Sequence, residues 1–200
     1  MRPPTRTWRP ACRVPAPWAP TAEATVVSPR VLVSRCLLGD AVRYDGRDKR
    51  DARVLALSAQ GLELVPVCPE VAAGLGVPRS PIRLVQVDPG GAIRALGVDD
   101  ASFDPSDALR AQARACAALP GIAGAVLKAR SPSCALDDAQ LFDVSGQPLG
   151  QAAGLFAATL LACLPGLPVA VESSLDDAGP VRDFVAAVFR YARHRAAGSK

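Results

Sequence analysis

Aromatic side chains are scarce in this sequence: Phe, Tyr and Trp together make up 4% of its 200 residues. The core must therefore be built mainly from Ala, Val and Leu, and a platform of stacked rings for single-stranded nucleic acid is not expected. With 50% apolar and 21% charged residues, the composition excludes a disordered, collagen-like or coiled-coil protein. The length suits one domain with a sizeable core.

Most of the chain also lacks an excess of positive charge. The formal net charge is +4, but residues 1–29 carry a net +3, which leaves +1 for residues 30–200. A nearly neutral domain does not offer a broad surface for phosphate groups. We therefore expect no stable complex with nucleic acid, whereas the oligomeric state is left open by the sequence.

No uninterrupted apolar run long enough for targeting or membrane insertion is found. Residues 1–29 hold seven of the 19 prolines and no apolar stretch of the kind a signal peptide needs, so a disordered Pro/Arg-rich extension is expected. Residues 152–171 are uncharged, but Pro165-Gly166-Leu167-Pro168 interrupts them and favours a buried helix–turn–strand unit over a membrane span. We expect a domain at 30–195, a disordered tail at 196–200 and a cytoplasmic location.

Short apolar runs alternate with helical patterns from residue 31 onward. Strands are expected at 31–33, 62–65, 123–127 and 169–171, helices at 51–59, 104–119, 152–163 and 180–194, and a hairpin at 82–96. Alternating strands and helices predict βαβ units and a parallel sheet covered on both faces. With right-handed crossovers this is an α/β fold: a three-layer, Rossmann-like domain with a mostly parallel sheet and a small hairpin insertion.

Three of the six cysteines directly follow a predicted strand: Cys36, Cys68 and Cys134. The carboxyl ends of parallel strands share one edge of the sheet, so these thiols are expected to meet there although they are far apart in sequence. Cys116 and Cys163 lie instead within apolar helical runs and are expected to be small buried side chains.

Three convergent thiols are compatible with more than one kind of site. Disulfides would leave one cysteine unpaired. A structural zinc ion prefers four ligands, often in local pairs that are missing here, and the single histidine, His194, is a poor fourth ligand. An iron–sulfur cluster held by three cysteines, with one iron open to substrate, suits the count. A cluster, a thiol-based site and a zinc site all remain open on spacing alone.

Polar residues next to these cysteines add chemical groups to the predicted edge. Glu70 follows Cys68 closely and offers a carboxylate that either acts in proton transfer or forms an ordinary salt bridge. Ser131 and Ser133 precede Cys134 with two hydroxyls that either cap a turn or orient a substrate or water. The loop after Cys36 contains Arg43, Tyr44, Asp45 and Arg47, which could bind a planar polar ligand or simply be solvated.

The order of these motifs resembles the DUF523 family over about residues 30–171. The residues that carry the resemblance are Ser34-Arg35-Cys36-Leu37-Leu38-Gly39, Val42-Arg43-Tyr44-Asp45-Gly46, Pro66-Val67-Cys68-Pro69-Glu70, Gly74-Leu75-Gly76-Val77-Pro78-Arg79 and Lys128-Ala129-Arg130-Ser131-Pro132-Ser133-Cys134. That family includes thiouracil desulfidases that hold a [4Fe–4S] cluster on three cysteines.

The resemblance implies a role for each matching position. Cys36, Cys68 and Cys134 would be the cluster ligands, and Glu70 and Ser131 the acid/base carboxylate and the substrate-site serine. Substrate contacts are expected from Ser34, Arg43, Tyr44 and Asp45. Ala135 departs from the family, which usually has Gly there, and a positive φ at this position would strain it.

The function that the resemblance implies is cluster-dependent, hydrolytic removal of sulfur from a small thiolated pyrimidine, a base or a nucleoside, with release of sulfide. The alternative is a non-catalytic, cluster-bearing module that binds or senses sulfide or thio-compounds.

Overall fold

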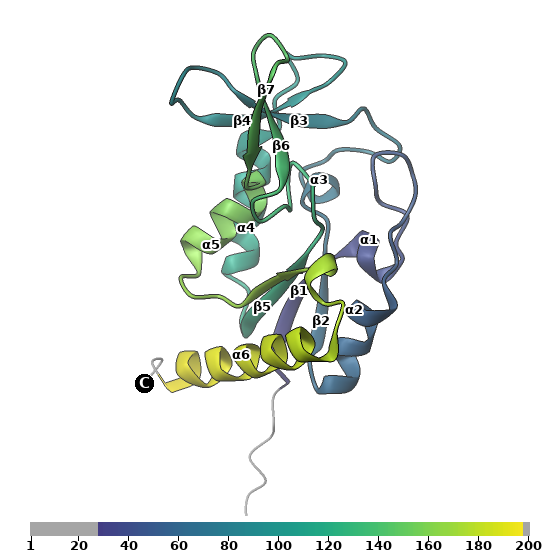
Figure 1. Ribbon diagram of the computed structural model, residues 1–200, viewed down its shortest axis with the longest axis vertical. Helices are drawn as coiled ribbons and strands as arrows, with labels where there is room; N and C mark the ends of the chain where they lie inside the picture. Colours follow the sequence, from purple (N-terminus) through teal and green to yellow (C-terminus); the bar gives the residue numbers. More distant parts are fainter. Residues whose placement is uncertain (1–27, 198–200) are drawn as a thin grey trace, which may run out of the picture.

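The computed structural model describes residues 28–197, which form two sheets joined by helices (Figure 1). Of the extension expected at residues 1–29, only residues 28 and 29 lie within the described range. The last helix continues to Ala197, two residues into the segment expected as a tail, and residues 198–200 lie outside the described range. Within residues 28–197, no helix has both the length and the apolar character needed to cross a membrane.

Sheet A is the parallel sheet that the sequence predicts, with its strands in the order β2-β1-β5-β8. The strand bounds are β1 (Arg30–Ser34), β2 (Glu63–Val67), β5 (Ile122–Leu127) and β8 (Val169–Val171). Every residue of β5 is buried because both faces of the sheet are covered. The predicted parallel arrangement is confirmed.

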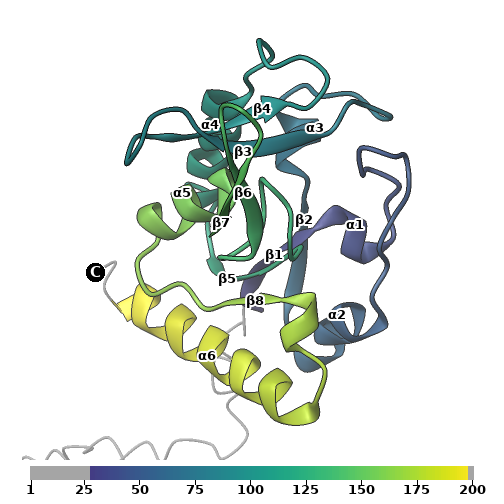
Figure 2. The ribbon, with the colours of Figure 1, turned by 45° about the horizontal axis from the view of Figure 1, so that its top comes forward.

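Helices cover sheet A on both sides and give the three predicted layers (Figure 2). Val31 and Val33 of β1 pack into one core cluster with α2 and α6, whereas Leu32 packs into the opposite cluster with α4 and α5. The helix bounds are α2 (Ala52–Ala56), α4 (Ser106–Ala117), α5 (Leu155–Cys163) and α6 (Ala178–Ala197). Cys116 is buried as expected, but the expectation for Cys163 is wrong: its thiol is exposed because α5 ends there.

Sheet B is larger than the hairpin that the sequence predicts. The expected hairpin is present, but a second hairpin joins it, and the strand order is β4-β3-β6-β7 with β3 and β6 parallel. The bounds are β3 (Ile82–Gln86), β4 (Ile93–Gly97), β6 (Ala139–Asp143) and β7 (Pro148–Ala152). Strand β7 contains Pro and Gly and is largely exposed, so neither β propensity nor alternating hydrophobicity marks it.

Short helical turns follow three of the strands and the helix α2. They are α1 (Arg35–Leu38), η1 (Leu57–Gln60), α3 (Pro69–Ala72) and η2 (Glu172–Ser174). The helix expected at 51–59 is α2 followed by η1; Asp51 caps it by accepting the backbone N–H groups of Arg53 and Val54, and it ends at Gly61 with φ 80°. Asp104 likewise accepts the N–H of Ser106 at the start of α4.

Helix α6 packs on sheet A through a position that admits no side chain. A Cβ at Gly124 of β5 would lie 2.7 Å from Cγ2 of the fully buried Val188. We expect Gly124→Ala to lower the free energy of unfolding by about 1–3 kcal/mol, because the helix must move away from the sheet. Urea unfolding followed by circular dichroism measures this change.

The matched control is Gly179→Ala, at the start of α6, where an added Cβ meets nothing within 4 Å. This variant should keep or slightly raise the stability, since Ala favours helix. Equal unfolding midpoints for the Gly124 variant and the wild type would contradict the packing argument.

Candidate active site

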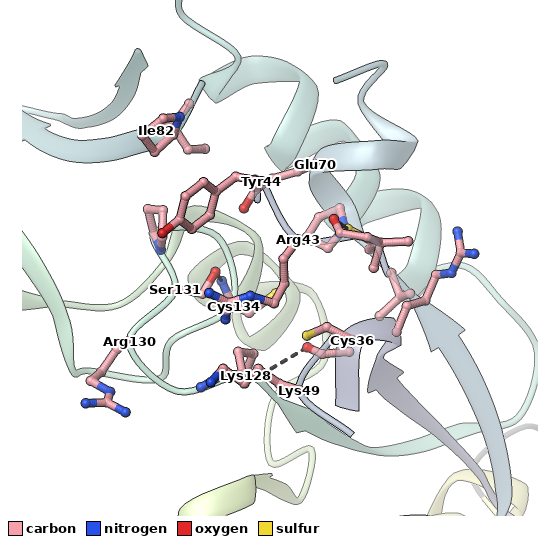
Figure 3. A pocket seen from close by; sticks show the side chains of 18 of the residues that line it. Cys36, Arg43, Tyr44, Lys49, Glu70, Ile82, Lys128, Arg130, Ser131 and Cys134 are labelled. Carbon is pink, nitrogen blue, oxygen red and sulfur yellow. Dashed lines mark hydrogen bonds between the residues drawn. The ribbon is translucent and has the colours of Figure 1, made fainter. Parts of the chain in front are cut away.

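A cavity of about 420 Å³ opens at the carboxyl edge of sheet A. Ser34 and Val67, the last residues of β1 and β2, line it together with the segment after β5, and so does Ile82, the first residue of β3 in sheet B. Figure 3 shows Ile82 on the opposite side of the cavity from Cys36 and Lys128. Cys36, Cys68 and Cys134 all line it. The structure therefore places all three thiols around one cavity at the expected edge of the sheet, and their role as ligands stays a prediction.

Each of the three cysteines is held by a different local element. Cys36 lies in the short helix α1 directly after β1. Cys68 occupies the extended position before α3, with its Sγ 4.0 Å from the carbonyl oxygen of Val42. Cys134 lies in a turn in which Oγ of Ser131 accepts the backbone N–H groups of Ser133 and Cys134 at 3.2 Å each. Ser131 thus shapes the turn that carries the third thiol.

Burial is the main influence on the acidity of these thiols. It raises the pKa of Cys36 to about 11, with the neighbouring Cys68 adding to the shift and the cations of Lys128 and Arg43 opposing it. Burial also raises the pKa of Cys68 and, most strongly, that of Cys134. Without metal these thiols are therefore protonated at neutral pH, and a bound metal must displace their protons.

Within residues 28–197, no three His, Cys, Asp or Glu side chains converge closely enough to hold one metal ion. The three thiols surround a cavity instead of meeting at a point, and all five cysteines of the described chain are unpaired.

The turn that carries Cys134 also caps helix α5. The first backbone N–H groups of the helix donate to this turn, Leu155 to Pro132 O at 3.1 Å and Phe156 to Ser133 O at 3.0 Å. These bonds satisfy N–H groups that have no partner within the helix. Ala135 is fully buried here, and among the described residues only Arg130 combines a side chain with positive φ (59°), so the strain considered for Ala135 is not found.

Glu70 is held on both sides of its carboxylate. Oε2 accepts Nε and Nη2 of Arg79 at 3.0 and 2.7 Å, and Oε1 accepts the hydroxyl of Ser133 at 2.8 Å. The side chains of Glu70 and Arg79 are only 14% and 9% exposed. Arg79 was not expected as a site residue, and Ser133 was expected only as one of two hydroxyls beside Cys134, although both lie within the motifs that carry the family resemblance.

The loop after α1 places Arg43 and Tyr44 in the cavity wall, with the Arg43 guanidinium 5.6 Å from the centre of the Tyr44 ring (Figure 3). Asp45 accepts hydrogen bonds from Arg43 at 3.2 and 3.4 Å and from Arg47 at 2.9 Å, and these cations lower its pKa to about 2. Asp45 does not line the cavity, so the structure makes it the partner of Arg43 instead of the direct ligand contact expected from the sequence.

Ser34 joins two strands at the cavity floor. Its Oγ accepts the backbone N–H of Lys128 at 3.0 Å, and its side chain is almost fully buried. The Lys128 ammonium, which sequence reasoning missed, donates to Ala129 O at 3.0 Å and pairs with Glu172, whose other oxygen accepts the N–H of Ala129 at 2.9 Å. Only the fold shows this pairing, because Glu172 follows β8.

Positive charge dominates the cavity wall. Among the described residues that line it, Glu70 is the one acidic side chain, whereas the cations are Arg35, Arg43, Lys49, Arg79, Lys128 and Arg130. The backbone N–H of Lys49 donates to Cys36 O at 2.9 Å and so holds the Lys49 segment beside α1 (Figure 3). Walls of one sign favour ligands and products that carry negative charge or electron-rich atoms.

Comparison with known proteins gives two matches. A family model described as 2-thiouracil desulfurase matches residues 31–172, a range that includes all three cavity cysteines. Among solved structures, the chain is similar to a [4Fe-4S]-dependent thiouracil desulfidase, TudS (DUF523Vcz), at 28% identity and a TM-score of 0.54, over 74% of this chain and 93% of that chain. No curated protein matches the sequence significantly.

The contact between α5 and the Cys134 turn leads to a test of the site. A Cβ at Gly154 would lie 2.4 Å from the carbonyl carbon of Ser133 and 2.7 Å from the nitrogen of Cys134, and neither backbone atom can rotate away. We expect Gly154→Ala to displace the turn, lowering the free energy of unfolding by about 1–3 kcal/mol and reducing the iron bound after anaerobic reconstitution. Iron analysis and urea unfolding measure both effects, with Gly179→Ala as control. Wild-type iron content in the Gly154 variant would speak against this coupling.

Proposed function

The chain belongs to the 2-thiouracil desulfurase family, and on that premise we propose that it is a [4Fe–4S]-dependent desulfidase that replaces the sulfur of a thiolated pyrimidine by oxygen. Cys36, Cys68 and Cys134 would hold the cluster. The observation that carries the proposal is the gathering of these three free thiols, from three strand ends, around one cavity.

The donor set fits such a cluster. Soft thiolate ligands select iron–sulfur clusters, and three protein thiols leave one iron without a protein ligand. When bound, the cluster supplies a Lewis-acidic iron for the thiocarbonyl sulfur of the substrate. The similarity to TudS, described as [4Fe-4S]-dependent, supports the same cofactor.

Glu70 is proposed to orient and deprotonate the attacking water. Its Oε2 already accepts two hydrogen bonds from Arg79, whereas Oε1 accepts one from Ser133 and keeps a free lone pair. Oε1 is thus the atom that can accept a proton from water.

Ser131 is proposed to donate a hydrogen bond to the substrate. Its Oγ accepts two backbone N–H groups, which leaves its hydroxyl hydrogen free to point into the cavity that it lines (Figure 3). A donor at this position fits an oxygen or a ring nitrogen of the pyrimidine.

The overall reaction is hydrolysis and needs no external oxidant or reductant. One bond forms between the water oxygen and the thiocarbonyl carbon, the carbon–sulfur bond breaks, and the sulfur leaves as hydrosulfide. The cationic wall favours this anion as it develops. Arg43 and Tyr44 are proposed to bind the planar ring, and Ser34 to hold the floor beneath it.

The proposal includes a small-molecule base or nucleoside as substrate and a cytoplasmic location, since unpaired thiols and an iron–sulfur cluster suit a reducing compartment. No nucleic-acid complex is proposed, because residues 30–200 carry a net charge of only +1.

The cluster assignment predicts the behaviour of Cys68→Ala. Loss of one of three ligands should remove the brown colour, the iron and the acid-labile sulfide, and with them the decay of the 2-thiouracil ultraviolet band under anaerobic conditions. The control is Cys163→Ala, which removes an exposed thiol outside the cavity and should leave all of these unchanged.

Full iron content in Cys68→Ala would refute the ligand assignment. A wild-type protein that binds cluster and 2-thiouracil without forming uracil and sulfide would instead be the binding or sensing module considered above.

The loop that carries Arg43 and Tyr44 leads to a second prediction. Tyr44→Ala should raise the KM for 2-thiouracil by about 10-fold with a smaller change in kcat, because stacking of a base on an aromatic ring contributes about 1–3 kcal/mol. Tyr44→Phe keeps the ring and should retain the wild-type KM. Steady-state kinetics under anaerobic conditions measure both, and equal KM values for the Ala variant and the wild type would exclude stacking on Tyr44.

A further inference from the structure

Arg79 is a buried cation whose contacts extend well beyond its ion pair. Nη1 donates to the carbonyl oxygens of Val42 at 3.1 Å and Gly76 at 3.0 Å, in addition to the two bonds from Nε and Nη2 to Glu70. Its backbone N–H donates to Tyr44 O at 2.9 Å. One residue therefore contacts the carboxylate beside Cys68 and both sides of the backbone that presents Arg43.

The Glu70 carboxylate is also bound by Ser133, which lies in the turn that carries Cys134. Ser133 is fully buried, and its hydroxyl donates to Oε1 of Glu70 at 2.8 Å. Because Arg79 takes only Oε2, the two residues together fix the plane of the carboxylate and the direction of its one free lone pair. Neither residue has a role in the reaction proposed so far.

We propose that Arg79 is a positioning residue that couples the orientation of Glu70 to the placement of the substrate loop at residues 42–47. This inference deepens the proposed function and rests on it. Arg79 acts on chemistry through Glu70 and on substrate binding through the backbone of Val42 and Tyr44. Ser133 acts through Glu70 alone.

The shape of the guanidinium explains why Arg is needed here. Its planar fork supplies five N–H donors, of which the structure uses those of Nε, Nη1 and Nη2 at once. A lysine at this position keeps the charge beside Glu70, but a single ammonium cannot reach the carboxylate and both carbonyls together. The substitution Arg79→Lys therefore separates the effect of the positive charge beside Glu70 from the effect on the position of the loop.

The expected kinetic effects differ between the variants. Arg79→Met should lower kcat about 100-fold, in line with the cost of misplacing a catalytic group, and also raise KM. Arg79→Lys should raise KM similarly while kcat falls less. Ser133→Ala should lower kcat about 10-fold, less than the roughly 100-fold or more that proton-transfer catalysis contributes because Glu70 itself remains, and leave KM unchanged. A purely structural role would not separate kcat from KM in this way.

The decisive experiment is a double-mutant cycle in the reconstituted enzyme with 2-thiouracil as the probe. If Arg79 acts through Glu70, adding Arg79→Met to Glu70→Gln should change kcat by less than about 3-fold, because residues that act as a unit are not additive. An additive loss of kcat, or a KM unchanged in both Arg79 variants, would overturn the proposal. The double variant also removes the unpaired buried carboxylate that could prevent folding of Arg79→Met alone.

The control is Arg94→Met, which breaks an ion pair with Asp104 away from the cavity and should leave kcat and KM unchanged. If the wild-type enzyme shows no turnover, the proposed function fails, and crystal structures of the Arg79 variants decide this inference separately. Loss of the hydrogen bond between Glu70 and Ser133, together with displacement of residues 42–47 in Arg79→Met, supports it; an unchanged Glu70 and loop overturn it.

Discussion

Parallel pairing of β1 with both of its neighbours is the constraint on which the site depends. Strands β2 and β5 flank β1 and run parallel to it, so all three strands leave sheet A at the same edge. Each chain then turns within a few residues of a cysteine, and the hydrogen bond from Lys128 N–H to Ser34 Oγ ties two of these exits together. Sulfur side chains up to 98 residues apart in sequence thereby surround one cavity.

The cations of the cavity wall are of two kinds, those paired with a carboxylate and those that add to its positive charge. Cations dominate the wall, but four of them are paired with a carboxylate: Arg35 with Asp40, Arg43 with Asp45, Arg79 with Glu70 and Lys128 with Glu172. An ion pair fixes the orientation of the side-chain N–H donors of its cation, and this orientation matters for specific binding. The pairs therefore serve geometry, and the surplus of positive charge favours departure of an anion.

The sequence alone predicts the parallel sheet, its layers and the edge at which the cysteines meet, because buried strands such as Ile122–Leu127 have a strong local signal. Sheet B was predicted only in part, since the pairing of β3 with β6 is long-range and β7 has no apolar face. The exposure of Cys163 depends on where α5 ends. Arg79 and Lys128 were not predicted as site residues, and the bond from Ser133 to Glu70 was not predicted either, because each depends on a partner that only folding brings near.

The two sides of the cavity come from different sheets, and this separation bears on how such proteins diversify. The thiols follow the strand ends of sheet A, whereas Ile82 is the first residue of β3 in sheet B. Changes in the hairpins can therefore reshape what is admitted while the sulfur-bearing side stays intact. Substitutions in sheet B can therefore change which molecules such a protein accepts over evolution, while the three cysteines that follow the strands of sheet A are kept throughout.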